Sequence, residues 1–466
     1  MSATSGDAQV SHVALLPSAG MGHLTPFLRL ASTLASHGCR VTFIAIHPTV
    51  SSAESLHLSA LFSTYPQIHP LEFPLLHLDA MDAYKLADPF YLHCESIRRS
   101  AHLLLPLLTS LSPPLSSFIV DISLASAFIP IANKLDIPSY ILFTSSATML
   151  TLFAYLPGLI ADAKRIDDVA IPGMQPLPAS MIPPALHDPT NLFTKQFIEN
   201  GRALLQAKAI LVNTFESLEA DAVAALNGGA VVRGLPPVVA IGPLHQPAAR
   251  PSGSPGRTFA WLDAQPARSV VYVSFGSRTA LSRAQIKELG VGLERSGCRF
   301  LWVVKSKIVD REDGEGLEEL VGNGLLERGR GRGKGLVVKG WVDQNEVLGH
   351  GAVGGFVSHC GWNSVVEAAA CGVRILAWPR GADQRVNASL VERSGLGVWA
   401  REWGWDGEEG AEVVRGEEIG QRVRELLGDT HVGESVARVR EEALRASGVG
   451  GSSYEGLADL IEKWRA

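Results

Sequence analysis

The segment from Trp341 to Gln384 holds the residues of this 466-residue chain whose types and spacing are best suited to chemistry. It reads WVDQNEVLGHGAVGGFVSHCGWNSVVEAAACGVRILAWPRGADQ. Asn363 and Ser364 follow a buried-type apolar run and open a helix-like stretch, whose free N–H groups and dipole favour an anion. Glu367 lies four residues after Asn363 and so on the same helical face. This arrangement can bind a diphosphate at the helix tip and a ribose diol one turn deeper.

Polar and aromatic side chains follow the neighbouring apolar runs of the same segment. The run Ile375–Trp378 leads to Asp383 and Gln384, whose carboxylate and amide suit sugar hydroxyls. Trp341, after a run of its own, offers a flat face to a base. A purely structural reading explains the apolar positions of this segment. It does not explain so many polar and aromatic residues where strands are expected to end.

A second candidate site lies near the amino terminus, where the apolar run Val13–Leu16 leads into the turn PSAGMGH. The small residues allow a tight turn from strand to helix at the carboxyl end of a parallel sheet, where ligands bind in such folds. His23 would then stand at the helix start, whose dipole disfavours imidazolium, so that the neutral ring can accept a proton. Asp121 directly follows the run Phe118–Val120 and would orient His23 if the two strands are neighbours.

Two other interpretations of this turn remain open on its residues alone. His23 can be a packed or surface histidine without a chemical role. The turn can also be a dinucleotide fingerprint, but Thr25 stands where that motif has its third glycine. The next apolar run ends at Ile46-His47-Pro48, without the acid that would bind a ribose.

Short apolar runs bounded by Gly or Pro alternate with helix-like segments through both halves of the chain. Continuous runs of this kind are typical of strands covered on both faces, and their alternation with helices predicts parallel sheets. The pattern occurs twice and therefore predicts an α/β protein with two doubly wound domains. The runs are Val13–Leu16, Val41–Ile46, Phe118–Val120, Tyr140–Phe143, Ile210–Val212, Val238–Ile241, Val270–Ser274, Phe300–Val304, Leu336–Val338, Gly355–Ser358, Ile375–Trp378 and Gly397–Ala400.

Composition shifts mark the domain boundaries. The stretch HQPAARPSGSPGR is rich in Pro, Gly and Ser and suits a linker. We expect a first domain over residues 1–245, a linker over 246–257, a second domain over 258–433, and a helical segment over 434–466 that packs back on the first domain. The stretch Asp310–Gly335 is dense in Gly and charge and is predicted to be an irregular surface loop.

Composition and charge exclude several classes of function. The chain carries 41 basic and 47 acidic residues, a net charge of −6, and no basic block beside an aromatic cluster, so we expect no nucleic-acid partner. Its five cysteines form no CxxC pair, which argues against a disulfide framework or a zinc site. The first ten residues lack the features of a signal peptide, and no apolar span of about 18 residues occurs. We expect a soluble, cytoplasmic monomer with no membrane partner.

The segment from Trp341 to Gln384 resembles the signature of the plant secondary-product UDP-glycosyltransferases. The likeness extends over almost the whole chain, through PSAGMGHLTP and WLDAQPARSVVYVSFGS. It implies the GT-B fold, two Rossmann-like domains that face each other across a cleft. The first would bind the acceptor and the second a UDP-sugar. UDP-glucose would be the co-substrate, and we expect neither a metal nor a further cofactor.

The resemblance implies roles for individual residues of the donor site. Trp341 would stack on the uracil, with Val342 and Gln344 beside it. Glu367 would bind the ribose. The phosphates would be bound by Ser277, His359, Asn363 and Ser364.

The resemblance also implies how the sugar and the acceptor are handled. Trp362, Asp383 and Gln384 would bind the sugar, which Thr144 and Ser145 approach from the acceptor domain. His23 matches the family's catalytic base and Asp121 its partner. Two departures, Val342-Asp343 for Ala-Pro and Arg374 for Pro, remove no side chain assigned to the donor.

The amino-terminal half narrows the resemblance to the plant flavonoid C-glucosyltransferases. The matching segments are DPFYLHCESIRRS, ILFTSSA and LHDPTNLFTKQFIENGR, from which Asp88, Phe90 and Leu186 are candidate acceptor contacts. This likeness implies inverting transfer of glucose to carbon of a 2-hydroxyflavanone or a phloretin-like phenol. The alternatives are a flavonoid O-glucosyltransferase and a nucleotide-sugar-binding protein without turnover.

Overall fold

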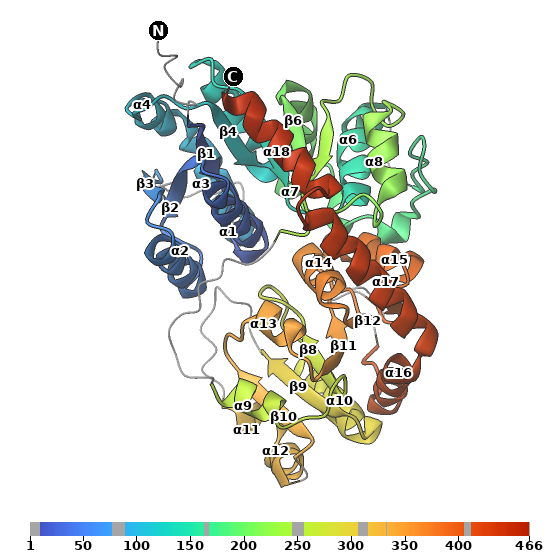
Figure 1. Cartoon of the computed structure of the whole chain (residues 1–466). Coiled ribbons are helices and arrows are strands. Elements are labelled where there is room, and N and C mark those ends of the chain that lie inside the picture. The colour runs from blue at the N-terminus through green and yellow to red at the C-terminus, as the bar shows by residue number, and fades with distance from the viewer. Residues whose placement is uncertain are drawn as a thin grey trace. The chain divides into compact units, whose positions relative to one another are not determined.

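The computed structural model describes residues 10–76, 89–162, 167–244, 256–305, 316–331, 333–404 and 412–465. This part of the chain contains two wholly parallel sheets, one of seven strands and one of six (Figure 1). The chain divides into two compact units. Unit 1 comprises residues 1–180, 184–249 and 446–466, and unit 2 comprises residues 181–183 and 250–445. The predicted α/β class with two parallel sheets is therefore confirmed.

The sheet of unit 1 has the order β3-β2-β1-β4-β5-β6-β7, so the chain starts in the middle and winds outward in both directions. Its central strands are apolar and buried throughout because helices cover both faces. The strands are β1 (His12–Leu16), β2 (Arg40–His47), β3 (Ile68–Pro74), β4 (Ser117–Asp121), β5 (Ser139–Phe143), β6 (Ala209–Val212) and β7 (Val238–Ala240).

Sequence reasoning missed one strand of this sheet, β3. Only Ile68 and Phe73 of its residues IHPLEFP are buried. It pairs with β2 alone and so forms an edge, where prolines such as Pro70 are tolerated because no second neighbour needs their N–H. A search for continuous apolar runs overlooks strands of this type.

The helices of unit 1 pack their apolar sides on this sheet. In α1 the buried residues include Leu24, Phe27 and Leu34, which join the core beneath β1 and β2. The helices are α1 (Met21–Ser36), α2 (Ser52–Thr64), α3 (Pro89–Arg99), α4 (Leu104–Thr109), α5 (Ala125–Asn133), α6 (Ala147–Asp162), α7 (Leu192–Ala203), α8 (Ala220–Asn227) and α18 (Ser452–Arg465).

The carboxyl-terminal segment forms two helices rather than one continuous element. The glycine-rich stretch 448–451 separates α17 (Thr430–Ser447) from α18, and Gly450 adopts a positive φ of 80° there. Most of α17 belongs to unit 2, whereas α18 belongs to unit 1. Trp464 of α18 lies edge-on to Tyr140 with the ring centroids 5.3 Å apart, so the last helix completes the core of unit 1 (Figure 1).

The sheet of unit 2 has the order β10-β9-β8-β11-β12-β13. Its strands are β8 (Val270–Ser274), β9 (Arg299–Val304), β10 (Gly335–Lys339), β11 (Val353–Ser358), β12 (Arg374–Ala377) and β13 (Gly397–Trp399). The helices besides α17 are α9 (Arg257–Asp263), α10 (Arg283–Ser296), α11 (Leu317–Val321), α12 (Asn323–Gly331), α13 (Gln344–Gly349), α14 (Trp362–Cys371), α15 (Gln384–Arg393) and α16 (Gly416–Gly428).

The sequence predicted an irregular loop and an interdomain linker in or next to unit 2, and only the loop can be compared with the structure over most of its described length. The irregular loop predicted over Asp310–Gly335 is wrong where the structure describes it, because Leu320, Leu325 and Leu326 anchor α11 and α12 in the core. Most of the linker predicted over 246–257 lies outside the described residues, and its last residue already begins α9. No helix in the described ranges is both long and apolar enough to span a bilayer.

Candidate functional site

Unit 1 brings His23 and Asp121 together through the order of its strands. β1 pairs in parallel with β4, with Leu16 opposite Val120, so the segments that follow both strands leave the sheet at the same edge. His23 lies in the first turn of α1, directly after the turn that follows β1. Asp121 is the last residue of β4. The neighbouring strands on which the predicted contact depended are therefore present.

The His23 ring is oriented by a fully buried carboxylate. Nδ1 of His23 lies 2.9 Å from Oδ2 of Asp121 and 3.1 Å from Oγ1 of Thr144. The other oxygen, Oδ1, accepts hydrogen bonds from the N–H and the hydroxyl of Ser123, which hold the carboxylate in place. The His23 side chain is 26% exposed and that of Asp121 is 0% exposed. When Nδ1 carries the proton toward Asp121, Nε2 is the basic nitrogen of the ring.

The turn before His23 requires glycine at one position. Gly20 is the N-cap of α1 and has a φ of 88°, which side-chain-bearing residues rarely adopt. A Cβ atom placed there would lie 2.9 Å from the Phe90 ring. Phe90 is itself next to His23, with the ring centroids 5.7 Å apart. Close packing of this aromatic ring on the glycine thus sets the position of the turn.

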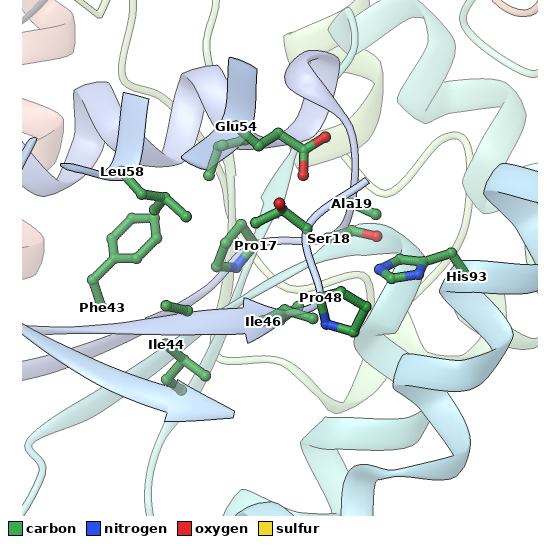
Figure 2. Close-up of a pocket in the computed structure, with 13 residues that line it drawn as sticks. Pro17, Ser18, Ala19, Phe43, Ile44, Ile46, Pro48, Glu54, Leu58 and His93 are labelled. Carbon is green, nitrogen blue, oxygen red and sulfur yellow. The ribbon is translucent and has the colours of Figure 1, made fainter. Parts of the chain in front are cut away.

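The carboxylate of Glu54, a residue that sequence reasoning missed, is buried behind this turn at 5% exposure. Figure 2 shows it pointing from α2 toward Ser18 and Ala19, while His93 approaches the same turn from α3. Burial raises the pKa of Glu54, and the N–H groups of Val50 and Gly20 oppose that shift. Burial lowers the pKa of His93. Glu54 follows the α2 N-cap by three residues, a capping signal that marks a helix start but not this location.

The residues after β5 complete the surroundings of His23. Thr144 contacts the ring directly, and Ser145 is the next residue. The start of α6 behind them is held by Glu219, a fully buried carboxylate that accepts the N–H groups of Ala147 at 2.9 Å and Thr148 at 2.8 Å. Burial raises the pKa of Glu219 against these hydrogen bonds. Glu219 comes from a distant segment, and no sequence signal indicated it.

The three candidate acceptor contacts differ in where the structure places them. Phe90 lies beside His23, as described above. Leu186 is 1% exposed within the short helical turn Pro184–His187, so its side chain is part of the interior. Asp88 lies outside the described residues. The structure adds Tyr91 and Phe193, which extend an aromatic row from Phe90 with centroid separations of 5.5 and 5.0 Å.

Unit 2 gathers a second set of residues where β8 and β11 end. The two strands are neighbours, and the segments that follow them contain Ser277 and His359. The His359 ring lies between two glycines, because a Cβ at Gly276 would be 2.6 Å from Nε2 and one at Gly361 would be 2.5 Å from it. Gly361 is also the N-cap of α14 and supplies no side-chain cap, so the first turn of this helix is open to an anion.

The His359 ring is neutral at physiological pH. It is buried, and desolvation together with the positive charge of Lys305 lowers its pKa to about 4. Its Nδ1 atom is buried without a hydrogen-bond partner among the described residues. A neutral imidazole can donate one hydrogen bond to a phosphate oxygen without carrying charge itself. Asn363 and Ser364 occupy the first turn of α14 beside it.

Gln344, Ser364 and Glu367 form a hydrogen-bonded group between α13 and α14. Nε2 of Gln344 donates to Oγ of Ser364 at 2.8 Å and to Oε2 of Glu367 at 2.9 Å. Glu367 is 6% exposed, whereas the Trp341 side chain is 50% exposed. Val342 next to it is partly buried, and Trp362, at 3% exposure, is almost wholly interior. The predicted base and ribose contacts therefore lie together, with Trp341 offering an accessible aromatic face.

Asp383 and Gln384 stand at the start of α15, after β12. Oε1 of Gln384 accepts the N–H groups of Arg380 at 2.7 Å and Gly381 at 3.0 Å, which leaves its amide N–H groups for a ligand. Oδ2 of Asp383 accepts a hydrogen bond of 3.0 Å from Asn387. Asn387 also donates to the Cys360 carbonyl and so ties α15 to the segment after β11. Sequence reasoning did not identify Asn387.

A family model described as UDP-glucoronosyl and UDP-glucosyl transferase matches residues 230–403, which include the unit 2 site. The chain is 52% identical to UDP-glycosyltransferase 708G2 of Citrus unshiu, over 100% of this chain and 99% of that protein. It is 53% identical to UDP-glycosyltransferase CGT of Oryza sativa subsp. indica, over 98% of this chain and 97% of that one.

Two solved structures also resemble this chain over almost its whole length. The chain superimposes on LpCGTa in complex with UDP with a TM-score of 0.87 at 52% identity, covering 98% of this chain and 100% of that one. It superimposes on Medicago truncatula UGT71G1 complexed with UDP-glucose with a TM-score of 0.84 at 30% identity, covering 99% and 100%.

Proposed function

This chain belongs to the plant UDP-glycosyltransferase family and uses a UDP-sugar as its co-substrate, and we propose that it transfers glucose from UDP-glucose to carbon of a flavonoid-type phenol. The acceptor would be a 2-hydroxyflavanone or a phloretin-like phenol. Unit 1 would bind the acceptor and unit 2 the donor. The observation that carries the proposal is the His23–Asp121 pair, in which a buried carboxylate orients a partly exposed imidazole.

In the proposed reaction His23 removes the proton of an acceptor phenol through Nε2, and Asp121 stabilises the imidazolium that forms. The phenolate charge delocalises onto the ortho carbon, which attacks the anomeric carbon from the face opposite UDP. The new C–C bond forms as the bond from the anomeric carbon to the diphosphate oxygen breaks, so the configuration inverts. The ring carbon then gives its proton to solvent water, which restores aromaticity and leaves a phenolate, and this phenolate takes a proton back from the imidazolium.

The donor would be bound by the residues gathered in unit 2. Trp341 would stack on the uracil beside Val342 and Gln344, and Glu367 would accept hydrogen bonds from the ribose diol. The open first turn of α14, with Ser277, His359, Asn363 and Ser364, would bind the diphosphate and stabilise the charge that develops on it. Trp362, Asp383 and Gln384 would contact the glucose.

We propose transfer to carbon rather than to oxygen because two relatives that match almost the whole length of this chain carry CGT in their names. The test is mass spectrometry of the products formed from UDP-glucose with a panel of phloretin-like and flavanone acceptors, before and after acid hydrolysis. A C–C linkage survives hot acid, whereas an O-glycoside releases glucose. Acid-labile products would make the chain a flavonoid O-glucosyltransferase. Failure to release UDP with any phenol would favour a binding protein without turnover.

A further inference from the structure

A lysine outside the family signature lies at the same sheet edge as the unit 2 site. Lys305 directly follows β9, which pairs with β8, and β8 pairs with β11 (Figure 1). Lys305, Gly276 and His359 thus follow three adjacent strands in spatial order. Nζ of Lys305 donates a hydrogen bond of 3.1 Å to the carbonyl of Gly276, the residue that packs against the His359 ring.

The charge of Lys305 has no acidic partner in the part of the chain that the structure describes. Its printed hydrogen bond goes to a neutral carbonyl, and its ammonium group has two further N–H donors. Burial lowers the pKa of Lys305 to about 8. A partly desolvated cation is costly unless an anion accompanies it. This arrangement is therefore suited to an anionic ligand.

The described side chains around Lys305 do not compensate its charge. His359 is the ionisable side chain that interacts with it from the β11 side, and that ring is neutral. On the β8 side, Arg278 follows Ser277 and is exposed. The adjacent hollow is lined by Lys305 together with residues such as Ser274, Gly276 and Thr279, and no other lining residue is ionisable.

We propose that Lys305 contacts the diphosphate of the bound nucleotide sugar and supplies positive charge to UDP as it leaves. This proposal rests on the function proposed above. Neutral His359 can donate a hydrogen bond but no charge, whereas the Lys305 ammonium supplies charge at the neighbouring strand end. When the bond between the anomeric carbon and the diphosphate oxygen breaks, the added negative charge on the diphosphate lies opposite this cation.

Binding measurements with UDP and with uridine separate this role from a structural one. Lys305→Met should weaken UDP binding by roughly 10- to 100-fold, because a charged hydrogen bond to the diphosphate is lost. It should leave uridine binding within about twofold, because uridine has no phosphate. Lys305→Arg should retain most of the UDP affinity, since it keeps the charge. Titration calorimetry at one salt concentration gives all the dissociation constants.

Lys334→Met is the matched control. Lys334 lies in the same unit and also donates to a glycine carbonyl, that of Gly297 at 3.2 Å, but it is exposed at the start of β10. Its replacement should change neither UDP nor uridine binding. A Lys305→Met protein that binds UDP like the wild type, or that loses uridine binding to the same extent, would overturn the proposal.

The pH dependence of UDP binding provides an independent test. Below about pH 8 Lys305 is protonated before UDP binds, so affinity is at its full value. Above that pH a proton must be taken up on binding, and UDP affinity should fall by up to about tenfold per pH unit. This decline should be absent in Lys305→Met and in Lys305→Arg. A wild-type decline that persists in both variants contradicts the role, and a wild type without UDP affinity would overturn the proposed function as well.

Discussion

The side-chain amide of Gln344 donates to the carboxylate of Glu367 at 2.9 Å and thereby joins α13 to α14 at the proposed nucleotide site. The same amide donates to Ser364 at 2.8 Å. This hydrogen bond occupies one of about four acceptor positions on the two Glu367 oxygens, so it does not by itself block a ribose diol. The hydrogen bond from Gln344 also fixes the direction in which the carboxylate points.

Glu367→Ala should weaken UDP binding roughly 10- to 100-fold, because hydrogen bonds between a charged group and the ribose hydroxyls are lost. The fold should persist, since α14 keeps its apolar contacts. Titration calorimetry with UDP measures the effect. Glu441→Ala, at an exposed position of α17 in the same unit, is the control. Wild-type UDP affinity in the Glu367 variant would show that this carboxylate does not bind the ribose.

His23→Ala should lower kcat by about 10²–10⁴-fold with little change in UDP affinity, because a general base supplies a factor of this size. Asp121→Asn should cost less, since the base remains while its orientation and the stabilisation of its charged form are weakened. Its acid limb in the pH–rate profile should also move to lower pH, because the imidazolium loses its carboxylate partner. An acid limb that stays in place or rises contradicts the pairing.

Asp383→Ala should reduce turnover with UDP-glucose by about tenfold or more, since a hydrogen bond to a bound sugar hydroxyl contributes roughly 1–3 kcal/mol. Asp383 also accepts a hydrogen bond from Asn387, so the loss has two possible origins. Asn387→Ala separates them, because it removes the support and leaves the carboxylate. Steady-state kinetics on both variants should give the larger loss for Asp383→Ala. Unchanged kinetics there would remove Asp383 from the sugar site.

Gly20→Ala and Gly22→Ala should differ although both lie in the same turn. Alanine at Gly20 would adopt a φ of 88° and place its Cβ 2.9 Å from the Phe90 ring, so both stability and kcat should fall. A Cβ at Gly22 meets nothing within 4 Å, and alanine in a helix is favoured over glycine by about 1 kcal/mol. Thermal midpoints should therefore fall for the first variant and stay level or rise for the second. Equal midpoints would contradict the packing described for the turn.

His359 should make the protein less stable in acid. Its folded-state pKa of about 4 lies below the ordinary value of 6.5, so the unfolded chain binds a proton that the native ring refuses. The stability associated with the neutral ring is present above about pH 6.5 and is lost as pH falls toward 4, by an amount on the order of 3 kcal/mol.

Comparison with His359→Asn isolates this contribution, because the other acid-sensitive groups are common to both proteins. The thermal midpoint of the wild type relative to the variant should fall between pH 7 and pH 5. A difference between the two midpoints that does not change with pH would show that His359 is not held neutral by burial.

Much of the architecture could be predicted because its causes are local. The apolar runs that form the central strands are continuous, since helices cover both faces of each sheet, and each predicted run lies within or next to an observed strand. The edge strand β3 escaped because only Ile68 and Phe73 of its residues are buried, so it has no continuous apolar run. The helices α11 and α12 escaped because a few leucines among many glycines and charges anchor them.

The sequence by itself determined the residue types at the strand ends, the helix start at Asn363 for which anion binding is proposed, and the resemblance on which the proposed donor site rests. Only the tertiary structure decided which side chains meet. Residues 23 and 121 touch because β1 and β4 are neighbours, and Glu219, Asn387 and Lys305 reach the sites from segments without a motif. A hydrogen bond between distant segments depends on strand order and on burial, and neither leaves a signal in the local sequence.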